Sequence, residues 1–328
     1  MSLPPAHRHR VAGGALVLLL MTALGVTVTV AQDDSAPRPV SATDVASPDE
    51  PVSRPKPVID DGAIPWPKDG QSAVELEGTG FLGMRGEQRP VPIASLTKVM
   101  TAYVILKEHP LKTGEPGPRI KVDRQAAYEV GVGDESTAPV QAGQTYSQRQ
   151  LLELLLLPSA NNVARLLARW DAGSQDAFVK KMQRAAGELG MDHSTYTGAS
   201  GIEPTTRSTA ADQLTLARAA MKDPVFRDIV ASRTVTVPGI GPIHNTNAIL
   251  NTPGVVGLKT GSSTPAGGNL LWACEVRVGD TTRLLIGAVL HQRANTTPSE
   301  GLHAALDSSR ILITELRSQL TSSRTDVS

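Results

Sequence analysis

The stretch that most constrains this chain runs from Pro92 to Met100. Ser95 and Lys98 stand three residues apart at its centre. An apolar run at roughly helical spacing follows, made up of Val99, Met100, Tyr103, Val104 and Leu106. Pro92 lies just before this run, where a proline suits a chain that enters a helix. Residues three apart share a helix face, so the spacing predicts that the serine hydroxyl and the lysine amine can touch.

This pair of side chains can form a nucleophile and its base. A serine hydroxyl is a weak nucleophile until a neighbouring base takes its proton. Lys98 can be that base if burial or nearby positive charge lowers its pKa. The backbone N–H of Ser95, at a helix N-terminus, suits a developing oxyanion. Ser-x-x-Lys is common, however, and Ser53 to Lys56 repeats it in a proline-rich stretch that cannot be helical.

Composition excludes several classes of function. The chain has 328 residues and equal numbers of acidic and basic side chains. It therefore lacks the excess of positive charge that would predict nucleic-acid binding. The single cysteine, Cys274, excludes an intramolecular disulfide and a cysteine-based zinc site. The seven histidines show no metal-ligand spacing, so we expect no metal site.

The N-terminal segment predicts export from the cytoplasm. Residues 11–31 form an apolar run that follows Arg8 and Arg10, which is typical of an export signal. The run is also just long enough to span a bilayer. Residues 1–31 are therefore either a cleaved signal peptide or an N-terminal membrane anchor, and both place the remainder of the chain outside the cytoplasm.

The remainder divides into three parts. Residues 32–62 are rich in Pro, Asp, Ser and Ala and predict a disordered linker. The folded domain is expected over residues 63–320. Residues 321–328 are polar and are expected to form a loose tail.

A short polar loop lies between two predicted apolar helices. The first helix covers residues 148–157 and stops at Pro158, and the second contains Val163 to Trp170. Ser159 and Asn161 lie in the loop, from which they can reach into a cleft. The alternative is that one of them only caps the second helix, because Ser and Asn are favoured caps.

The second half of the chain predicts further helices and most of a sheet. The predicted strands are 73–77, 234–237, 255–262, 270–278 and 284–290, and the predicted later helices are 174–189, 209–221 and 298–320. Alternation along 270–278 puts Cys274 on a buried face, as an inert core residue. His244 lies in a polar loop with no evident partner, which favours a structural or exposed position.

Lys-Thr-Gly occurs twice, and its context separates the two copies. Lys112 begins one copy in a turn-rich segment, whereas Lys259 begins the other in a predicted strand. Taking the second copy, three motifs follow one another along the chain: Ser95-x-x-Lys98, Ser159-x-Asn161 and Lys259-Thr260-Gly261. This order on a helix start, an interhelical loop and a strand is the pattern of penicillin-recognising serine acyl transferases.

The chain resembles the low-molecular-mass serine D-alanyl-D-alanine carboxypeptidases over about residues 63–318. Residues 92–102 look like the nucleophile segment of that family, 208–212 like its helix-opening signature and 245–261 like its approach to the edge strand. The resemblance implies an α/β fold of the α+β type, as in β-lactamases and transpeptidases. An antiparallel sheet flanked by helices would adjoin a largely helical subregion, with the site between them.

The resemblance also implies an activity. The enzyme would remove the terminal D-alanine from peptidoglycan stem peptides through an acyl-enzyme on Ser95, and β-lactams would acylate the same residue. Lys98 would accept the proton of Ser95. Ser159, together with Lys259, would return a proton to the leaving nitrogen, and Asn161 would bind a substrate amide. No metal or organic cofactor is needed.

The remaining candidate residues would bind substrate. Thr260 would hydrogen-bond the terminal carboxylate, and Gly261 would let another backbone approach closely. The N–H group of Ser262 would join that of Ser95 in the oxyanion hole. Many family members carry an arginine for the carboxylate after the last strand. Arg293 is the candidate here, although the local match is poor.

Two rival functions share parts of this pattern. A class A-like β-lactamase adds a glutamate that activates the deacylating water, and Glu203 follows Ser159 at a suitable distance. Ala160 stands where that class has an aspartate, and the residues after Pro204 do not continue its loop. A non-catalytic penicillin-binding module is the second rival, although all the motif side chains are present.

Many family members also have a C-terminal β-rich domain and anchor, so any anchoring here would fall to the N-terminal run.

Overall fold

The computed structural model describes residues 59–322. The predicted export segment, the linker up to residue 58 and the tail from residue 323 lie outside the described residues. The described part begins with a 3-10 turn, η1 (Asp61–Ala63). The backbone N–H of Asp60 donates to Gln319 Oε1 at 2.9 Å, so the first described residues contact the last helix. No helix within residues 59–322 is long and apolar enough to cross a membrane.

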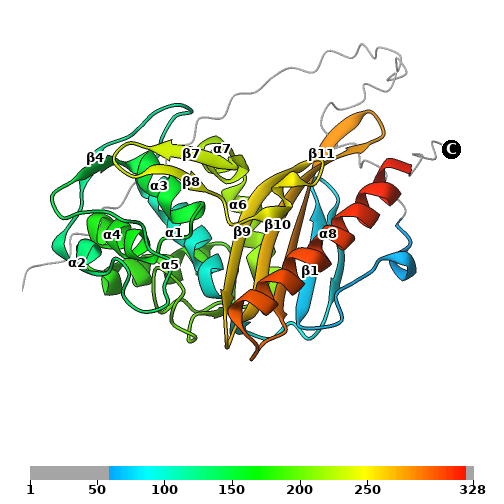
Figure 1. Cartoon of the computed structure of the whole chain (residues 1–328). Helices are drawn as coiled ribbons and strands as arrows, with labels where there is room; N and C mark the ends of the chain where they lie inside the picture. Colours follow the sequence, from blue (N-terminus) through cyan, green and yellow to red (C-terminus); the bar gives the residue numbers. More distant parts are fainter. Residues whose placement is uncertain (1–58, 323–328) are drawn as a thin grey trace, which may run out of the picture. The chain divides into compact units, whose positions relative to one another are not determined.

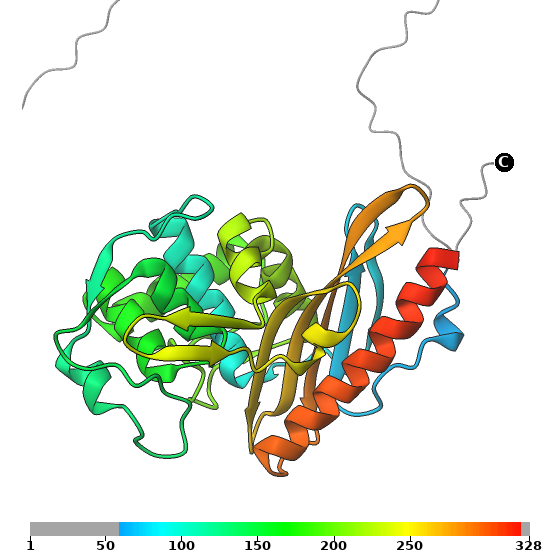
Figure 2. The same ribbon diagram turned by 45° about the horizontal axis from the view of Figure 1, so that its top comes forward.

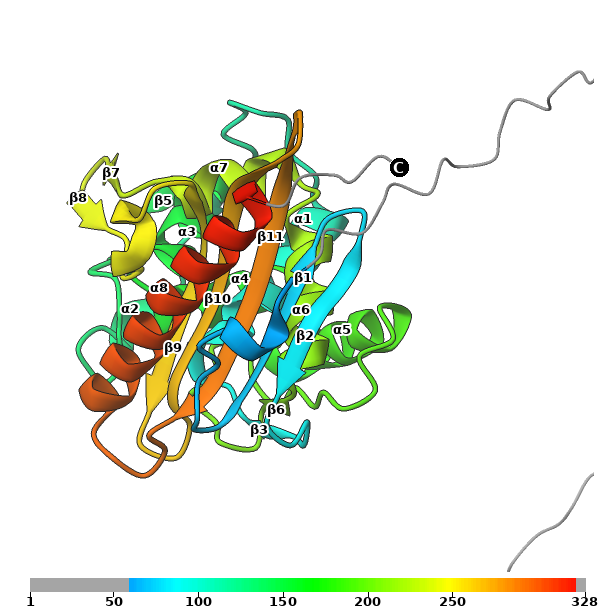
Figure 3. The same cartoon turned by 90° about the vertical axis from the view of Figure 1, so that its right-hand side faces the viewer.

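The main sheet joins the two ends of the described chain. Its strands are β1 (Gln71–Leu76), β2 (Gly80–Arg85), β9 (Val255–Ser263), β10 (Gly267–Val278) and β11 (Thr281–Gln292). They lie in the order β2-β1-β11-β10-β9, and every neighbouring pair is antiparallel. The sheet therefore combines the β1–β2 hairpin with three strands from the end of the described chain, and β9 forms one of its edges (Figures 1 and 3).

Helices cover both faces of this sheet. One face packs against α8 (Pro298–Ser322), which crosses the sheet diagonally in Figure 3. Trp272 and Cys274 lie in that layer, and Cys274 is buried as predicted. Leu271 and Ala273, on the opposite face of the same strand, belong to the core shared with the helical part. The predicted alternation is correct, but both faces of β10 are buried there because each is covered.

The helical part is built around α1 (Thr97–Glu108), which packs against α3, α4, α5 and α6. The other helices are α2 (Arg124–Tyr128), α3 (Gln148–Leu156), α4 (Asn161–Ala172), α5 (Gln175–Glu188), α6 (Ala210–Ala220) and α7 (Pro224–Ala231). Helix α6 contacts both α1 and the sheet, through β1 and β11, so it joins the helical part to the sheet (Figure 1).

Short two-stranded ribbons complete the architecture. They pair β3 (Val91–Pro92) with β6 (Arg207–Ser208), β4 (Arg119–Lys121) with β5 (Thr145–Ser147), and β7 (Thr234–Val237) with β8 (Gly241–His244). The β7–β8 hairpin lies beside the helical part (Figure 2). The chain then passes through the 3-10 turn η3 (Ala248–Asn251) into β9.

Two expectations about local structure need correction. Ser95 lies in a 3-10 turn, η2 (Ala94–Leu96), and the α-helix begins only at Thr97. Ala94 has a φ of 47°, a left-handed conformation that tightens the entry to α1. The capping alternative for the polar loop is wrong, because Ala160 is the N-cap of α4 and no side chain caps this end. Ser159 and Asn161 are therefore not needed as caps.

Candidate active site

Ser95 and Lys98 meet as the spacing predicted. Lys98 Nζ lies 2.8 Å from Ser95 Oγ, although Ser95 belongs to the 3-10 turn and Lys98 to α1. Ser95 is half-buried, whereas Lys98 is fully buried. The amine therefore approaches the hydroxyl from inside the protein and leaves the solvent side of Ser95 open to a substrate.

The other neighbours of Lys98 direct its lone pair toward Ser95. Its Nζ donates to Asn161 Oδ1 at 2.6 Å and to the backbone oxygen of Ser200 at 2.8 Å. Both of these oxygens can only accept. A neutral lysine amine has two N–H bonds and one lone pair, so these acceptors use both protons. The lone pair then faces the hydroxyl of Ser95, which can donate to it.

The surroundings of Lys98 favour this neutral form. Burial lowers the pKa of Lys98 well below its ordinary value, and the nearby charges of Lys259 and Arg165 lower it further. Glu135 and Glu203 act in the opposite direction with smaller effects. The pKa of Lys98 is therefore depressed by both causes that the sequence suggested, with burial the larger one.

Lys259 lies on edge strand β9 and is also buried, with 1% of its surface exposed. Its Nζ donates to the backbone oxygen of Thr260 at 3.0 Å. Burial lowers the pKa of Lys259 to about 7. A lysine near the midpoint of its titration at neutral pH can both give and take a proton.

Thr260 ties β9 to the polar loop between α3 and α4. Its Oγ1 lies 2.6 Å from Thr246 Oγ1. The backbone N–H of Thr246 in turn donates to the oxygen of Leu157 at 3.1 Å, just before the loop. The second and third motifs, far apart in the sequence, are therefore held together through a single threonine.

Gly261 lets β9 approach the serine turn. A Cβ atom at Gly261 would lie 2.9 Å from the backbone nitrogens of Ser95 and Leu96, too close for any side chain to fit without a shift. Within residues 59–322, β9 pairs only with β10, so its outer edge is unpaired beside this turn. Ser262 follows and is half-buried. The strand edge and the serine N–H therefore face the same region.

Asn161 contacts Lys98 from the start of α4, and Ser159 lies two residues before it. Ser159 has a φ of 66°, is 6% exposed, and its hydroxyl has no hydrogen-bond partner among the described residues. Asn161 is the first residue of α4 and contacts Lys98 directly. Asn162, its neighbour, instead donates to the backbone oxygens of Ala126 and Ala138 and has a structural role.

Three sequence candidates lie outside this group. Lys112 is exposed in a turn, in contrast to the buried Lys259. His244 is exposed at the end of β8 and contacts Thr234. Arg293 has a φ of 48° and is exposed between β11 and α8, without a described hydrogen bond to any other candidate. The Arg293 assignment therefore remains a prediction without a contact to support it.

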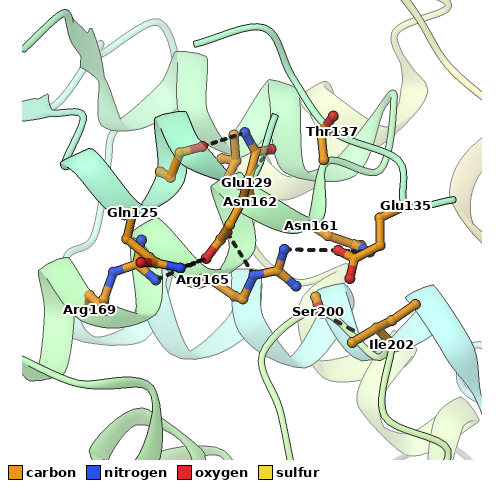
Figure 4. Close-up of polar contacts among 12 residues, drawn as sticks. Gln125, Glu129, Glu135, Thr137, Asn161, Asn162, Arg165, Arg169, Ser200 and Ile202 are labelled. Carbon is orange, nitrogen blue, oxygen red and sulfur yellow. Dashed lines mark hydrogen bonds and ion pairs between the residues drawn. The ribbon is translucent and has the colours of Figure 1, made fainter. Parts of the chain in front are cut away.

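Sequence reasoning did not identify several residues that shape the site. Ser200 supplies a backbone oxygen to Lys98, and the Asn161 amide donates to Glu135 Oε2 at 3.0 Å. Glu135 also accepts from Arg165 at 2.8 Å (Figure 4). Arg165 stands four residues after Asn161 on α4, a spacing that places both on one helix face and is the one available signal.

Comparison with known proteins gives a consistent family. A family model described as D-alanyl-D-alanine carboxypeptidase matches residues 72–291. D-alanyl-D-alanine carboxypeptidase DacB2 of Mycobacterium tuberculosis is 34% identical over 220 residues, which cover 62% of this chain and 70% of the relative. The D-alanyl-D-alanine endopeptidase of Pseudomonas aeruginosa is 31% identical, covering 60% of this chain and 64% of the relative. This chain thus spans slightly less than two thirds of the endopeptidase.

A solved structure agrees with this result. The Streptomyces K15 DD-transpeptidase superposes with a TM-score of 0.65 at 27% identity, covering 74% of this chain and 95% of the other. The expected fold, an antiparallel sheet flanked by helices with a helical subregion, is confirmed by this likeness and by the sheet described above. By their names, these three proteins are a carboxypeptidase, an endopeptidase and a transpeptidase.

Proposed function

We propose a reaction for this chain on the basis of its family. The chain belongs to the D-alanyl-D-alanine carboxypeptidase family and is a serine peptidase. It hydrolyses the bond between the two terminal D-alanines of a peptidoglycan stem peptide and releases D-alanine. The observation that carries this proposal is the contact between Ser95 and a buried Lys98 whose protons are both engaged by acceptors.

The first step forms an acyl-enzyme. Lys98 Nζ accepts the hydroxyl proton of Ser95 while Oγ attacks the carbonyl carbon of the penultimate D-alanine. The N–H groups of Ser95 and Ser262 stabilise the oxyanion. The short distance that Gly261 permits between β9 and the serine turn supports this pairing of two backbone donors.

The leaving amine then needs a proton. As the C–N bond breaks, Ser159 and Lys259 supply it, since the hydroxyl of Ser159 is free of other partners among the described residues and Lys259 has a pKa near neutrality. The proton that Lys98 took from Ser95 then passes to this pair and replaces the one it gave up. Asn161 holds the substrate amide. Water afterwards hydrolyses the ester on Ser95, and D-alanine and the shortened stem peptide are the products. The candidate residues require no metal or organic cofactor for these steps.

Substrate backbone pairs with the outer edge of β9, as in other cases of strand addition. Thr260 hydrogen-bonds the terminal carboxylate, and Arg293 is a further candidate for this contact. A β-lactam imitates the D-alanyl-D-alanine bond, enters the same position and acylates Ser95. A Ser95 that carries this acyl group cannot attack a stem peptide, so such compounds inhibit the enzyme.

The reaction takes place outside the cytoplasm, where peptidoglycan lies. Residues 1–31 export the chain and either remain as a membrane anchor or are removed. Fractionation of cells with an antibody to the folded domain separates these cases. Anchored protein sediments with membranes at full length, whereas secreted protein lacks the apolar run.

A single assay tests the proposed function. The full chain is incubated with diacetyl-L-Lys-D-Ala-D-Ala, and released D-alanine is measured for the wild type and for Ser95→Ala. The wild type should release D-alanine and Ser95→Ala should not. Release by Ser95→Ala at the wild-type rate would remove Ser95 from the reaction.

A further inference from the structure

A polar cluster beside the site holds the Asn161 amide from one side (Figure 4). Glu135 Oε2 accepts from Asn161 Nδ2 at 3.0 Å, and the backbone oxygen of Ser136 accepts from the Asn161 N–H at 2.8 Å. Two adjacent residues of the loop after α2 therefore contact the side chain and the backbone of Asn161. Arg165 Nη2 donates to the same Glu135 oxygen at 2.8 Å and fixes the carboxylate in place.

A carboxylate next to an amide settles which way the amide turns. Glu135 offers only acceptors, so it must face the nitrogen of Asn161. The oxygen then faces Lys98, to which it lies at 2.6 Å. With the amide turned over, its N–H groups would meet the N–H groups of Lys98 and its oxygen would meet the carboxylate. Lys98 would lose one of the acceptors that direct its lone pair to Ser95.

We propose that Glu135 is a positioning residue, held by Arg165, which keeps the Asn161 amide in the orientation that presents its oxygen to Lys98. This inference rests on the proposed function. Glu135 does not contact Ser95 or Lys98 by a described hydrogen bond and acts through Asn161.

The charges around Lys98 give Glu135 a second, measurable effect. Lys98 is faced by Lys259 from β9, Arg165 from α4, Glu135 from the loop after α2 and Glu203 from the loop before β6. Glu135 raises the pKa of Lys98 and thereby opposes the two cations. Loss of its charge should move the rising limb of the pH profile for acylation to lower pH.

Glu129 provides a matched control. It accepts from Arg165 Nε at 2.8 Å, on the other edge of the same guanidinium, and it is partly buried like Glu135. It does not bond to Asn161, and it is not among the charges with the largest effects on the pKa of Lys98. Removal of either glutamate deprives Arg165 of one partner, but only removal of Glu135 releases the Asn161 amide.

The test measures the rate of acylation by a fluorescent penicillin, with the full chain, in a double-mutant cycle. Glu135→Ala should slow acylation by about tenfold or more in the wild-type background, as misplaced catalytic groups do. At a pH above the rising limb, where Lys98 is neutral in every variant, Glu135→Ala should have no further effect in the Asn161→Ala background, and Glu129→Ala should acylate like the wild type. An equal loss in both backgrounds, or the same loss in Glu129→Ala, would overturn the proposal.

A second pair of variants covers the case in which Glu135→Ala does not fold. Glu135→Gln and Glu129→Gln keep the side-chain size and each remove one charge. Above the rising limb, Glu135→Gln should acylate more slowly than Glu129→Gln, because a glutamine also carries N–H donors and no longer fixes which way the Asn161 amide turns. Equal rates would contradict the proposal. Glu135→Gln should also move the rising limb to lower pH. If the wild type takes up no penicillin, the proposed function itself fails. If it is acylated on Ser95 and Glu135→Ala matches its rate, only the positioning role fails.

Discussion

Replacing Lys259 with methionine should stabilise the fold at neutral pH while it slows acylation. Lys259 is buried, and its pKa falls from 10.5 to about 7. Below that value the folded protein holds a buried ammonium, which is costly. Methionine has a similar length and no charge, so it removes this cost. It also removes the group that we propose delivers a proton to the leaving amine.

The magnitude follows from the two pKa values. The interval between 10.5 and about 7 corresponds to about 5 kcal/mol at 1.36 kcal/mol for each pH unit. Between these values the unfolded chain binds more protons, so stability rises with pH across this window. The cost is fully present below about pH 7 and is lost by about pH 10.5. Methionine cannot donate a hydrogen bond to the backbone oxygen of Thr260, and this loss reduces the gain in stability by about 1 kcal/mol.

Urea denaturation of the wild type and Lys259→Met at a series of pH values checks this reasoning. The variant should be more stable by about 4 kcal/mol near pH 6, and the difference should shrink as pH rises above about 7. Acylation should fall by about a hundredfold or more. Lys112→Met makes the same exchange at an exposed turn and should change neither quantity by much. A difference in stability that is the same at every pH would refute the argument.

Three further predictions concern other parts of the site. Ser95→Ala should show no adduct by intact-mass analysis after treatment with benzylpenicillin, and an adduct that persists would exclude Ser95 as the nucleophile. Glu203→Gln should leave deacylation nearly unchanged, and a fall of orders of magnitude would instead indicate a general base of the β-lactamase kind. Gly261→Ala should slow acylation strongly, because its Cβ would lie 2.9 Å from the nitrogen of Ser95 and would push β9 away. A wild-type rate in this variant would mean that β9 does not need this close approach.

Local signals predicted most of the elements. The helix predicted over 174–189 is α5, which Ser174 caps by accepting from the N–H of Ala177. Thr209 caps α6 in the same way. The apolar run over 284–290 lies within β11, between β1 and β10, as a central strand should. Such features depend on side chains and turns within a few residues, so a single sequence contains them.

Features that depend on backbone conformation were not predictable. The sequence placed Ser95 in a helix start, but a left-handed Ala94 produces a 3-10 turn before α1. Non-glycine residues with positive φ are uncommon and carry no local signature. Ser159 is another example, with a φ of 66°. Neither alanine nor serine favours this conformation locally, so the sequence alone does not indicate it.

Long-range partners explain the other omissions. Lys98 contacts Ser200 across 102 positions of the chain, and the oxygen of Ser200 is a backbone atom that any residue would supply. No pattern of side chains can indicate such a partner. Glu135 differs from Ser200, because its proposed role needs a carboxylate side chain. Its loop nevertheless has no hydrophobic periodicity from which its position beside α4 could be predicted. Its contact with Asn161 follows only from the fold.

The positions of these contacts explain why the three motifs work as one site. Ser95 and Lys98 belong to the helical part, whereas Lys259 belongs to the edge of the sheet. A side chain at Gly261 would keep β9 from the serine turn, and the Thr246–Thr260 contact keeps the strand beside the loop that carries Ser159. Burial of both lysines, which depresses their pKa values, needs this close approach. The geometry of the strand edge and the protonation of the two lysines are therefore consequences of the same packing.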